Sequence, residues 1–334
     1  MRALFIGGTG NISLACTRRA LEKNLEVIHL NRGTRPEKAP QGVTTLRADI
    51  RNADEVRRAL GGMRFDSVIQ WLGYLPEHVE ADIARFRDRT AQYVFISSAS
   101  AYRKPLPHPV ITESTPLGNP FWEYSQNKIA CERLLERAWE DSRFPYTVVR
   151  PSHTYDDGWI PTCFGSRDYT VARRILDGKE IVVPGDGQSL WTLTHASDFA
   201  RGFIGLLGNP TAIGQAFHIT SEEFLTWETI HQTIGLALGA GPRIVHVPSD
   251  FVARVCPERG KSLLGDKAHS AIFDNSKIKR YVLEFRATMP FAAGIRRSLA
   301  WLDAHSESKK VDAVIDGEYE KVLEAWRRAM EAVG

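Results

Sequence analysis

The chain has 334 residues, of which 43% are hydrophobic and 25% charged, a length that can bury the core of one large domain with a smaller lobe. Its 43 Lys and Arg residues nearly balance its 40 Asp and Glu residues and form no basic stripe, so we expect no nucleic-acid partner. No apolar run approaches the ~18 residues of a membrane span, so we expect no membrane partner either.

The four cysteines, Cys16, Cys131, Cys163 and Cys256, lie far apart and form no C-x-x-C pair. They are predicted to be reduced structural thiols, which favours a cytoplasmic protein. The sequence holds no H-E-x-x-H motif and no close His/Cys cluster, so we expect no metal.

The first predicted elements are a strand, a glycine turn and a helix. Residues 3–6 are apolar, the turn reads Gly7-Gly8-Thr9-Gly10-Asn11-Ile12-Ser13, and apolar side chains recur at helical spacing over residues 12–20. In this context, backbone N–H groups and the helix N-terminus can bind a pyrophosphate. The alternative is a tight turn without a ligand.

The end of the second predicted strand, residues 26–30, bears on the cofactor. An acidic residue there would bind the adenosine ribose of NAD and repel the additional phosphate of NADP. This chain instead has Asn31 followed by Arg32 and Arg35, a pattern that favours NADP over NAD. NAD remains the alternative if both guanidinium groups are solvated or stack on the adenine.

Strands at residues 44–46 and 65–71 and a helix at residues 53–60 continue an alternation that predicts a parallel sheet with helices on both faces. Asp49 precedes that helix, either as a cofactor contact or as a helix cap. Only one helix, starting near Pro76, fits between residues 73 and 93.

A Ser, a Tyr and a Lys form the candidate catalytic group. Tyr124 and Lys128 are four residues apart in a segment rich in helix formers, so both side chains leave the same helical face. A nearby ammonium would lower the pKa of the phenol from its usual ~10 and make it a general acid/base. Ser97 or Ser98, after the apolar residues 94–96, would hold the substrate oxygen.

These motifs resemble those of the extended short-chain dehydrogenase/reductases, the NAD-dependent epimerase/dehydratase family, over roughly residues 1–300. Gly7 and Gly10 match the first two glycines of the family's G-x-x-G-x-x-G motif, while the third is Ser13. Ser98 precedes Tyr102 by four residues, as in the family pattern, so the resemblance places the catalytic Ser there. Arg150-Pro151 and the segment from residue 184 to His195 and Asp198 match later landmarks.

The resemblance implies an α/β fold, a Rossmann-type doubly wound parallel sheet with a smaller mixed C-terminal substrate lobe. Residues 1–155 would form the dinucleotide-binding domain, completed by parts of residues 190–220, and residues 156–334 would form most of the lobe. The predicted catalytic residues are Ser98, Tyr124 and Lys128. The predicted cofactor contacts are Gly7, Thr9, Gly10, Asn11, Ile12, Asn31, Arg32, Arg35, Asp49, Ile50, Leu72, Gly73, Lys128, Pro151 and His153. The predicted substrate contacts are Ser98, Ser100, Tyr124, His153 and Trp191.

Several positions depart from the family pattern. Ala99-Ser100 replaces the Asp-Glu pair of the sugar-nucleotide 4,6-dehydratases, which makes that reaction unlikely to be the one catalysed here. Trp191 replaces an Arg that binds the substrate diphosphate, so Arg167, Arg173 or another cation substitutes, or the substrate is not a nucleotide-sugar. The short segment 73–93 removes part of the usual dimer interface and leaves a homodimer in doubt.

Three further expectations concern local structure. The Pro-rich residues 103–122 should form an irregular loop. His153 is expected to be a hydrogen-bonded structural histidine, with an acid/base or substrate role as the alternative. Asp198 is expected to cap a helix at residues 199–207, and amphipathic helices are expected at residues 291–302 and 319–330.

The sequence thus predicts an NAD(P)-dependent oxidoreductase or epimerase that transfers a hydride at a secondary alcohol or ketone of a sugar-like, potentially nucleotide-linked, small molecule. One alternative is a one-way NADPH-dependent carbonyl reductase. The other is a non-catalytic dinucleotide-binding protein with a regulatory or RNA-associated role.

Overall fold

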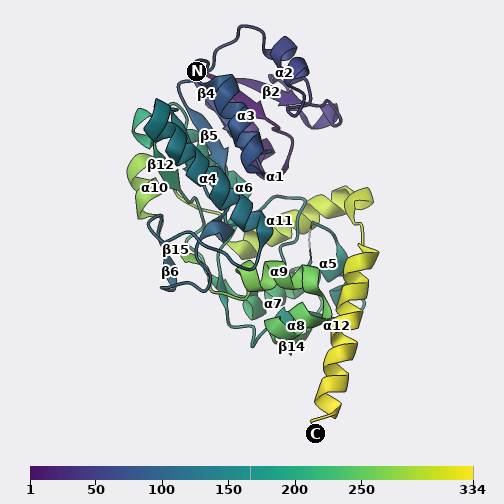
Figure 1. Ribbon diagram of the computed structural model, residues 1–334. Coiled ribbons are helices and arrows are strands. Elements are labelled where there is room, and N and C mark those ends of the chain that lie inside the picture. Colours follow the sequence, from purple (N-terminus) through teal and green to yellow (C-terminus); the bar gives the residue numbers. More distant parts are fainter. Residues whose placement is uncertain (166, 334) are drawn as a thin grey trace.

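The computed structural model in Figure 1 describes residues 1–165 and 167–333. A seven-stranded sheet, with every pair of neighbouring strands parallel, has the order β12-β7-β5-β4-β1-β2-β3. Its strands are β1 (Arg2–Ile6), β2 (Glu26–Asn31), β3 (Thr44–Arg47), β4 (Ser67–Gln70), β5 (Tyr93–Ile96), β7 (Tyr146–Val149) and β12 (Gln215–Phe217). The strand order reverses at β1, where the chain crosses to the other side of the sheet, as in the predicted doubly wound fold.

Helices cover both faces of this sheet. One apolar core joins the sheet to α1 (Asn11–Glu22), α6 (Ala196–Leu206) and α10 (Ser276–Tyr281). A second core joins the opposite face to α2 (Ala53–Leu60), α3 (Pro76–Phe86) and α4 (Glu123–Ser142). Because both faces are buried, β4, β5 and β7 consist entirely of buried residues rather than alternating buried and exposed ones.

A third core lies in the C-terminal lobe, below the sheet in Figure 1. The helices of the lobe are α5 (Thr170–Leu176), α7 (Trp227–Leu238), α8 (Ser249–Val255), α9 (Pro257–Ser262), α11 (Phe291–Ala304) and α12 (Ala313–Glu331). Its short strands are β6 (Val110–Ile111), β8 (His153–Tyr155), β9 (Glu180–Pro184), β10 (Leu190–Trp191), β11 (Leu193–His195), β13 (Leu225–Thr226), β14 (Arg243–Val247) and β15 (Ile272–Phe273). Among the described residues, no helix combines the length and the apolar character that crossing a membrane requires.

Two local predictions were wrong. Asp198 does not cap α6, because the His195 side chain takes that position and accepts from the Ser197 N–H. The buried Asp198 carboxylate instead accepts from the backbone N–H groups of Thr288 and Met289, and so ties α6 to the segment before α11. The irregular loop at residues 103–122 also contains β6, which pairs with β15 from far along the chain.

A buried ion pair links α4 to the end of β7. The Arg150 guanidinium donates to the Glu132 carboxylate at 2.6 Å, and their side chains are 5% and 1% exposed. The Ser97 hydroxyl donates to the same carboxylate, and Arg150 also lies over the Tyr102 ring. Breaking such a pair leaves a buried charge without a partner, which costs more than the pair itself contributes.

We predict that Glu132→Gln lowers the free energy of unfolding by about 3–5 kcal/mol, because Arg150 keeps its charge in a buried site. The double variant Glu132→Leu/Arg150→Met should recover most of this loss. Urea unfolding at neutral pH measures both variants. A double variant that is no more stable than the single one would contradict this account of the pair.

Candidate functional site

A cavity of about 840 Å³ opens at the carboxyl ends of the central strands, between the sheet and the lobe. It brings together most of the residues predicted from the sequence. Those that line it are Gly7, Thr9, Gly10, Asn11, Ile12, Asn31, Arg32, Arg35, Asp49, Ile50, Leu72, Ser98, Ser100, Tyr124, Lys128, Pro151 and His153. Two predicted residues, Gly73 and Trp191, are not part of this lining.

The glycine turn between β1 and α1 forms one wall of the cavity. Gly7 and Gly8 have φ angles of 107° and 108°, and a Cβ on Gly8 would lie 2.5 Å from His29 Nε2. Only glycine therefore fits position 8, which was not among the predicted contacts. The turn directs the N-terminus of α1 toward the cavity, a cradle that fits the pyrophosphate of a dinucleotide.

Ser13 and Asn11 complete this turn. Ser13 Oγ, at the position of the third glycine, accepts a hydrogen bond from the Gly10 N–H at 2.9 Å. The Asn11 side-chain amide donates to the Thr154 carbonyl at 2.8 Å and so joins α1 to β8. The Asn11 Oδ1 atom is buried without a partner, as expected for an acceptor that a ligand would satisfy.

The end of β2 presents the residues expected to select the cofactor. Asn31 Oδ1 accepts from the Gly33 N–H at 2.8 Å, which turns this side chain back onto its own loop. Arg32 and Arg35 are exposed at the cavity, and neither guanidinium group has a hydrogen bond or an ion pair among the described residues. Two free guanidinium groups fit a phosphate on the adenosine ribose.

The segment after β3 contains a site residue that we did not predict. Arg51 lines the cavity and donates to the Leu72 carbonyl at 2.5 Å. Asp49 accepts from the Arg51 N–H at 3.0 Å and does not cap α2, because Asn52 accepts from the N–H groups of Asp54 and Glu55. The only sequence feature that could have predicted Arg51 as a site residue is its position directly after Asp49 and Ile50, two predicted cofactor contacts.

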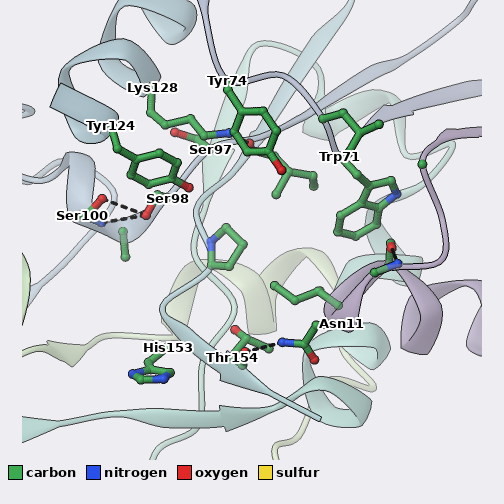
Figure 2. A pocket seen from close by; sticks show the side chains of 18 of the residues that line it. Asn11, Trp71, Tyr74, Ser97, Ser98, Ser100, Tyr124, Lys128, His153 and Thr154 are labelled. Carbon is green, nitrogen blue, oxygen red and sulfur yellow. Dashed lines mark hydrogen bonds between the residues drawn. The ribbon is translucent and has the colours of Figure 1, made fainter. Parts of the chain in front are cut away.

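The candidate catalytic residues lie along one wall of the cavity (Figure 2). Ser98 Oγ is hydrogen-bonded to Ser100 Oγ at 2.9 Å, and Ser125 donates to Ser100 at 2.7 Å. Ser97 instead donates to Glu132, which leaves Ser98 as the hydroxyl that interacts with Tyr124. The geometry therefore favours Ser98 over Ser97 for holding a substrate oxygen.

Lys128 is held by backbone carbonyls rather than by the phenol. Its Nζ donates to Gly73 at 2.6 Å and to Ile96 at 2.7 Å, and it lies 5.6 Å from the centroid of the Tyr124 ring. The side chain is 2% exposed, and burial lowers the pKa of Lys128 to about 8. Gly73, predicted as a cofactor contact, thus accepts a hydrogen bond from Lys128 through its backbone carbonyl.

The expected lowering of the Tyr124 pKa does not occur in this arrangement. Burial, with smaller contributions from Tyr74 and Asp266, raises the pKa of the Tyr124 phenol to about 12 against the opposing effect of the hydrogen bond with Ser98. Desolvation of the phenolate thus outweighs the ammonium, whose protons point at two carbonyls. The sequence spacing of Tyr124 and Lys128 could not predict that Tyr124 is buried or that Lys128 donates to the Gly73 and Ile96 carbonyls.

His153 does not have the complete set of hydrogen bonds expected for a structural histidine. Its Nε2 is buried without a partner among the described residues, and its ring packs against Trp159, Trp191 and Trp227. Burial lowers the pKa of His153 to about 3, so the ring is neutral at physiological pH. Trp159 Nε1, in the adjacent side chain, is also buried and unpaired.

Trp191 was predicted to contact the substrate, and its side chain lies outside the cavity lining. The side chain is 2% exposed, and its Nε1 donates to the Lys267 carbonyl at 3.1 Å. Arg167 and Arg173, the suggested substitutes for the missing Arg, pair with Asp156 and Asp177 and do not line the cavity. The cations on this side are Lys104 and Lys267.

A model of the NAD dependent epimerase/dehydratase family matches residues 3–220. Among curated proteins, a 2'-dehydrokanamycin reductase from Streptomyces kanamyceticus is 29% identical over 76% of this chain and 71% of its own length. The chloroplast stem-loop binding protein of 41 kDa b from Arabidopsis thaliana is 27% identical over 75% of this chain and 67% of its own length.

Solved structures show the same fold at low identity. An epimerase from Methanothermobacter thermautotrophicus superposes with a TM-score of 0.75 at 17% identity, covering 92% of this chain and 93% of that one. A UDP-glucuronic acid 4-epimerase from Bacillus cereus, in complex with NAD, gives a TM-score of 0.70 at 17% identity over 94% and 100% of the two chains.

The lowered pKa of Lys128 predicts a pH-dependent contribution to stability. Between about pH 8 and the ordinary value of 10.5, the unfolded chain holds this proton more firmly than the folded one, so this contribution increases with pH. Relative to Lys128→Met, the wild-type protein should gain on the order of 3 kcal/mol across this window.

Urea unfolding of both proteins at several pH values measures this gain. Lys261→Met, which removes an exposed lysine of α9, is the matched control and should give a flat difference from wild type. A difference between wild type and Lys128→Met that is equally flat would show that Lys128 is not buried as described.

Proposed function

Because the chain belongs to the NAD-dependent epimerase/dehydratase family and is an enzyme of the short-chain dehydrogenase/reductase type, we propose that it transfers a hydride at a secondary alcohol or ketone of a sugar-like substrate, using Ser98, Tyr124 and Lys128. The observation that carries this proposal is the sharing of one cavity by the Ser98 and Tyr124 hydroxyls and the glycine turn of α1. The substrate oxygen and the nicotinamide can therefore meet.

The chain's own residues supply binding and proton transfer. Ser98 and Tyr124 would hold the substrate oxygen between their hydroxyls, and the proton would move at Tyr124 Oη. The charge of Lys128, fixed by the Gly73 and Ile96 carbonyls, would favour the phenolate whenever Tyr124 gives up its proton. A dinucleotide held along Asn31, the glycine turn and Pro151 would supply the hydride chemistry through its nicotinamide.

Tyr124 is protonated near neutral pH because its pKa is about 12. A protonated phenol can donate to a carbonyl oxygen that receives a hydride, which favours the second candidate function, a one-way carbonyl reductase. The relative from Streptomyces kanamyceticus is named a reductase, whereas several structural neighbours are named epimerases. A reductase consumes one reduced nicotinamide per product, and an epimerase leaves the total unchanged.

The non-catalytic alternative draws support from the name of the Arabidopsis thaliana stem-loop binding protein. It would leave the polar wall formed by Ser98, Ser100, Tyr124 and Lys128 without a chemical role. Redox turnover with any sugar alcohol or ketone would exclude this alternative.

We predict that Tyr124→Phe lowers kcat by about 10²–10⁴-fold without changing nucleotide affinity, because the proton donor is lost while the nucleotide wall is intact. The measurement is nicotinamide absorbance with a panel of sugar-derived alcohols and ketones, together with nucleotide titration. Tyr281→Phe, on α10 and outside the cavity, is the matched control and should turn over as the wild type does. Near-normal turnover by Tyr124→Phe would refute the assignment.

We further propose that NADP is preferred over NAD, through Arg32 and Arg35. Arg32→Ala/Arg35→Ala should weaken NADP binding about tenfold to hundredfold and NAD binding by less than about threefold, because only NADP has the phosphate. Isothermal titration with both nucleotides measures this, with the exposed Arg64→Ala as control. Equal losses for the two nucleotides would show that Arg32 and Arg35 do not recognise the additional phosphate. Tighter binding of NAD than of NADP by the wild type would contradict the proposed preference.

A further inference from the structure

We infer that the substrate carries an oxyanion, a carboxylate or a phosphate ester, and that the Lys267 ammonium binds it. This inference rests on the proposed function, because it assigns the substrate class of the same cavity. It concerns a part of the cavity wall outside the glycine turn, which is formed by Lys104, Trp122, Trp159, Asp266 and Lys267.

Lys267 is the cation of this wall that makes no ion pair among the described residues. Lys104 lies 3.9 Å from Asp266 and forms an ion pair with it. Lys267 Nζ has no hydrogen bond among the described residues either; Asp266 acts on its charge only from beyond ion-pair distance, and the centroid of the Trp122 ring lies 5.9 Å from Nζ. Burial lowers the pKa of Lys267, which indicates an ammonium that water solvates poorly. Such a group gains more from an oxyanion than a surface lysine does.

The backbone fixes Lys267 at the cavity. It ends a π-helical turn, η4 (Leu263–Lys267), and its carbonyl accepts from two buried indoles, Trp191 at 3.1 Å and Trp227 at 2.9 Å. The Asn119 side chain donates to the Gly265 carbonyl at 2.6 Å and to the Ser100 carbonyl at 2.8 Å. The turn is thus tied to the segment that follows Ser98, and little reorganisation is needed on binding.

Two buried ring nitrogens near Lys267 also lack hydrogen-bond partners among the described residues. His153 Nε2 and Trp159 Nε1 are both buried without partners in the described part of the chain, and their rings are 5.3 Å apart. The indole can only donate, and the neutral imidazole can donate or accept. Buried polar atoms without partners are rare in proteins, so two adjacent ones in a cavity wall indicate a polar ligand group.

The cavity wall as a whole carries an excess of positive charge. Among its described lining residues, six are cationic and two are carboxylates. The cations are Arg32, Arg35, Arg51, Lys104, Lys128 and Lys267, and the carboxylates are Asp49 and Asp266. This excess attracts anions and opposes a positively charged substrate.

The distances also match a small substrate that is anionic at one end. The centroid of the Trp122 ring lies 5.0 Å from that of the Tyr124 ring and 5.9 Å from Lys267 Nζ. The same aromatic side chain is therefore close both to the proposed anion site and to the phenol that would hold the reacting oxygen. A sugar ring on Trp122 could reach both sites.

The test measures binding rather than turnover. Glucose, glucosamine, glucuronate and glucose 6-phosphate are titrated into the full-length protein saturated with nicotinamide nucleotide, with tryptophan fluorescence as the signal. We expect glucuronate or glucose 6-phosphate to bind about tenfold to hundredfold more tightly than glucose, and glucosamine to bind more weakly. The tighter of the two anions identifies the chemical class.

Lys267→Met should abolish this preference, and Lys267→Arg should restore part of it. The matched control Lys261→Met, a surface lysine of α9 that lies outside the cavity, should keep it. The same titrations with Tyr124→Phe should retain the preference even where turnover is lost, which separates this inference from the proposed catalytic role. Anions that bind no better than glucose, or not at all, or a preference that survives in Lys267→Met, would overturn the inference.

Discussion

The Lys128 ammonium joins three elements at the centre of the molecule. It extends from α4 and donates to the carbonyls that follow β4 and end β5, which fixes the catalytic wall relative to the sheet. The side chains around it include the rings of Tyr74, Phe95 and Tyr124, and it forms no ion pair with a carboxylate among the described residues. The packing of the surrounding core offsets the desolvation free energy of the Lys128 ammonium. The electrostatic field of this ammonium acts at the Tyr124 oxygen.

The parts of the fold that local patterns specify were predictable from the sequence. The glycine turn, the strand–helix alternation and the helix Ala53–Leu60 follow from spacing and composition. Features that depend on burial or on distant segments were not. The Tyr124 pKa depends on desolvation, and the contact of Trp191 with Lys267 joins residues 76 positions apart. No periodicity in the chain indicates either feature, which explains why Lys267 was missed and Trp191 was misassigned.

The cavity has two chemically different halves. The half beside α1 offers a glycine cradle, the Asn11 amide oxygen and two guanidinium groups, none of which has a partner in the described part of the chain, as a dinucleotide requires. The half beside the lobe offers aromatic rings, together with the His153 and Trp159 ring nitrogens and the Lys267 ammonium, which have no hydrogen bond within residues 1–165 and 167–333. Tyr124 and Ser98 lie where these halves meet, so a reaction between two bound molecules is the chemistry to which this arrangement is suited.

The order of strands in the sheet also constrains how the chain can be made. The edge beside β7 is completed by β12, which the ribosome adds more than 60 residues later, after α5, α6 and the short strands β8–β11. Until α6 and β12 emerge, the nascent sheet presents an open strand edge and lacks the covering side chains of α6. Such an edge is a template for pairing with other chains. Co-translational folding of this protein must therefore protect its N-terminal half until β12 has emerged.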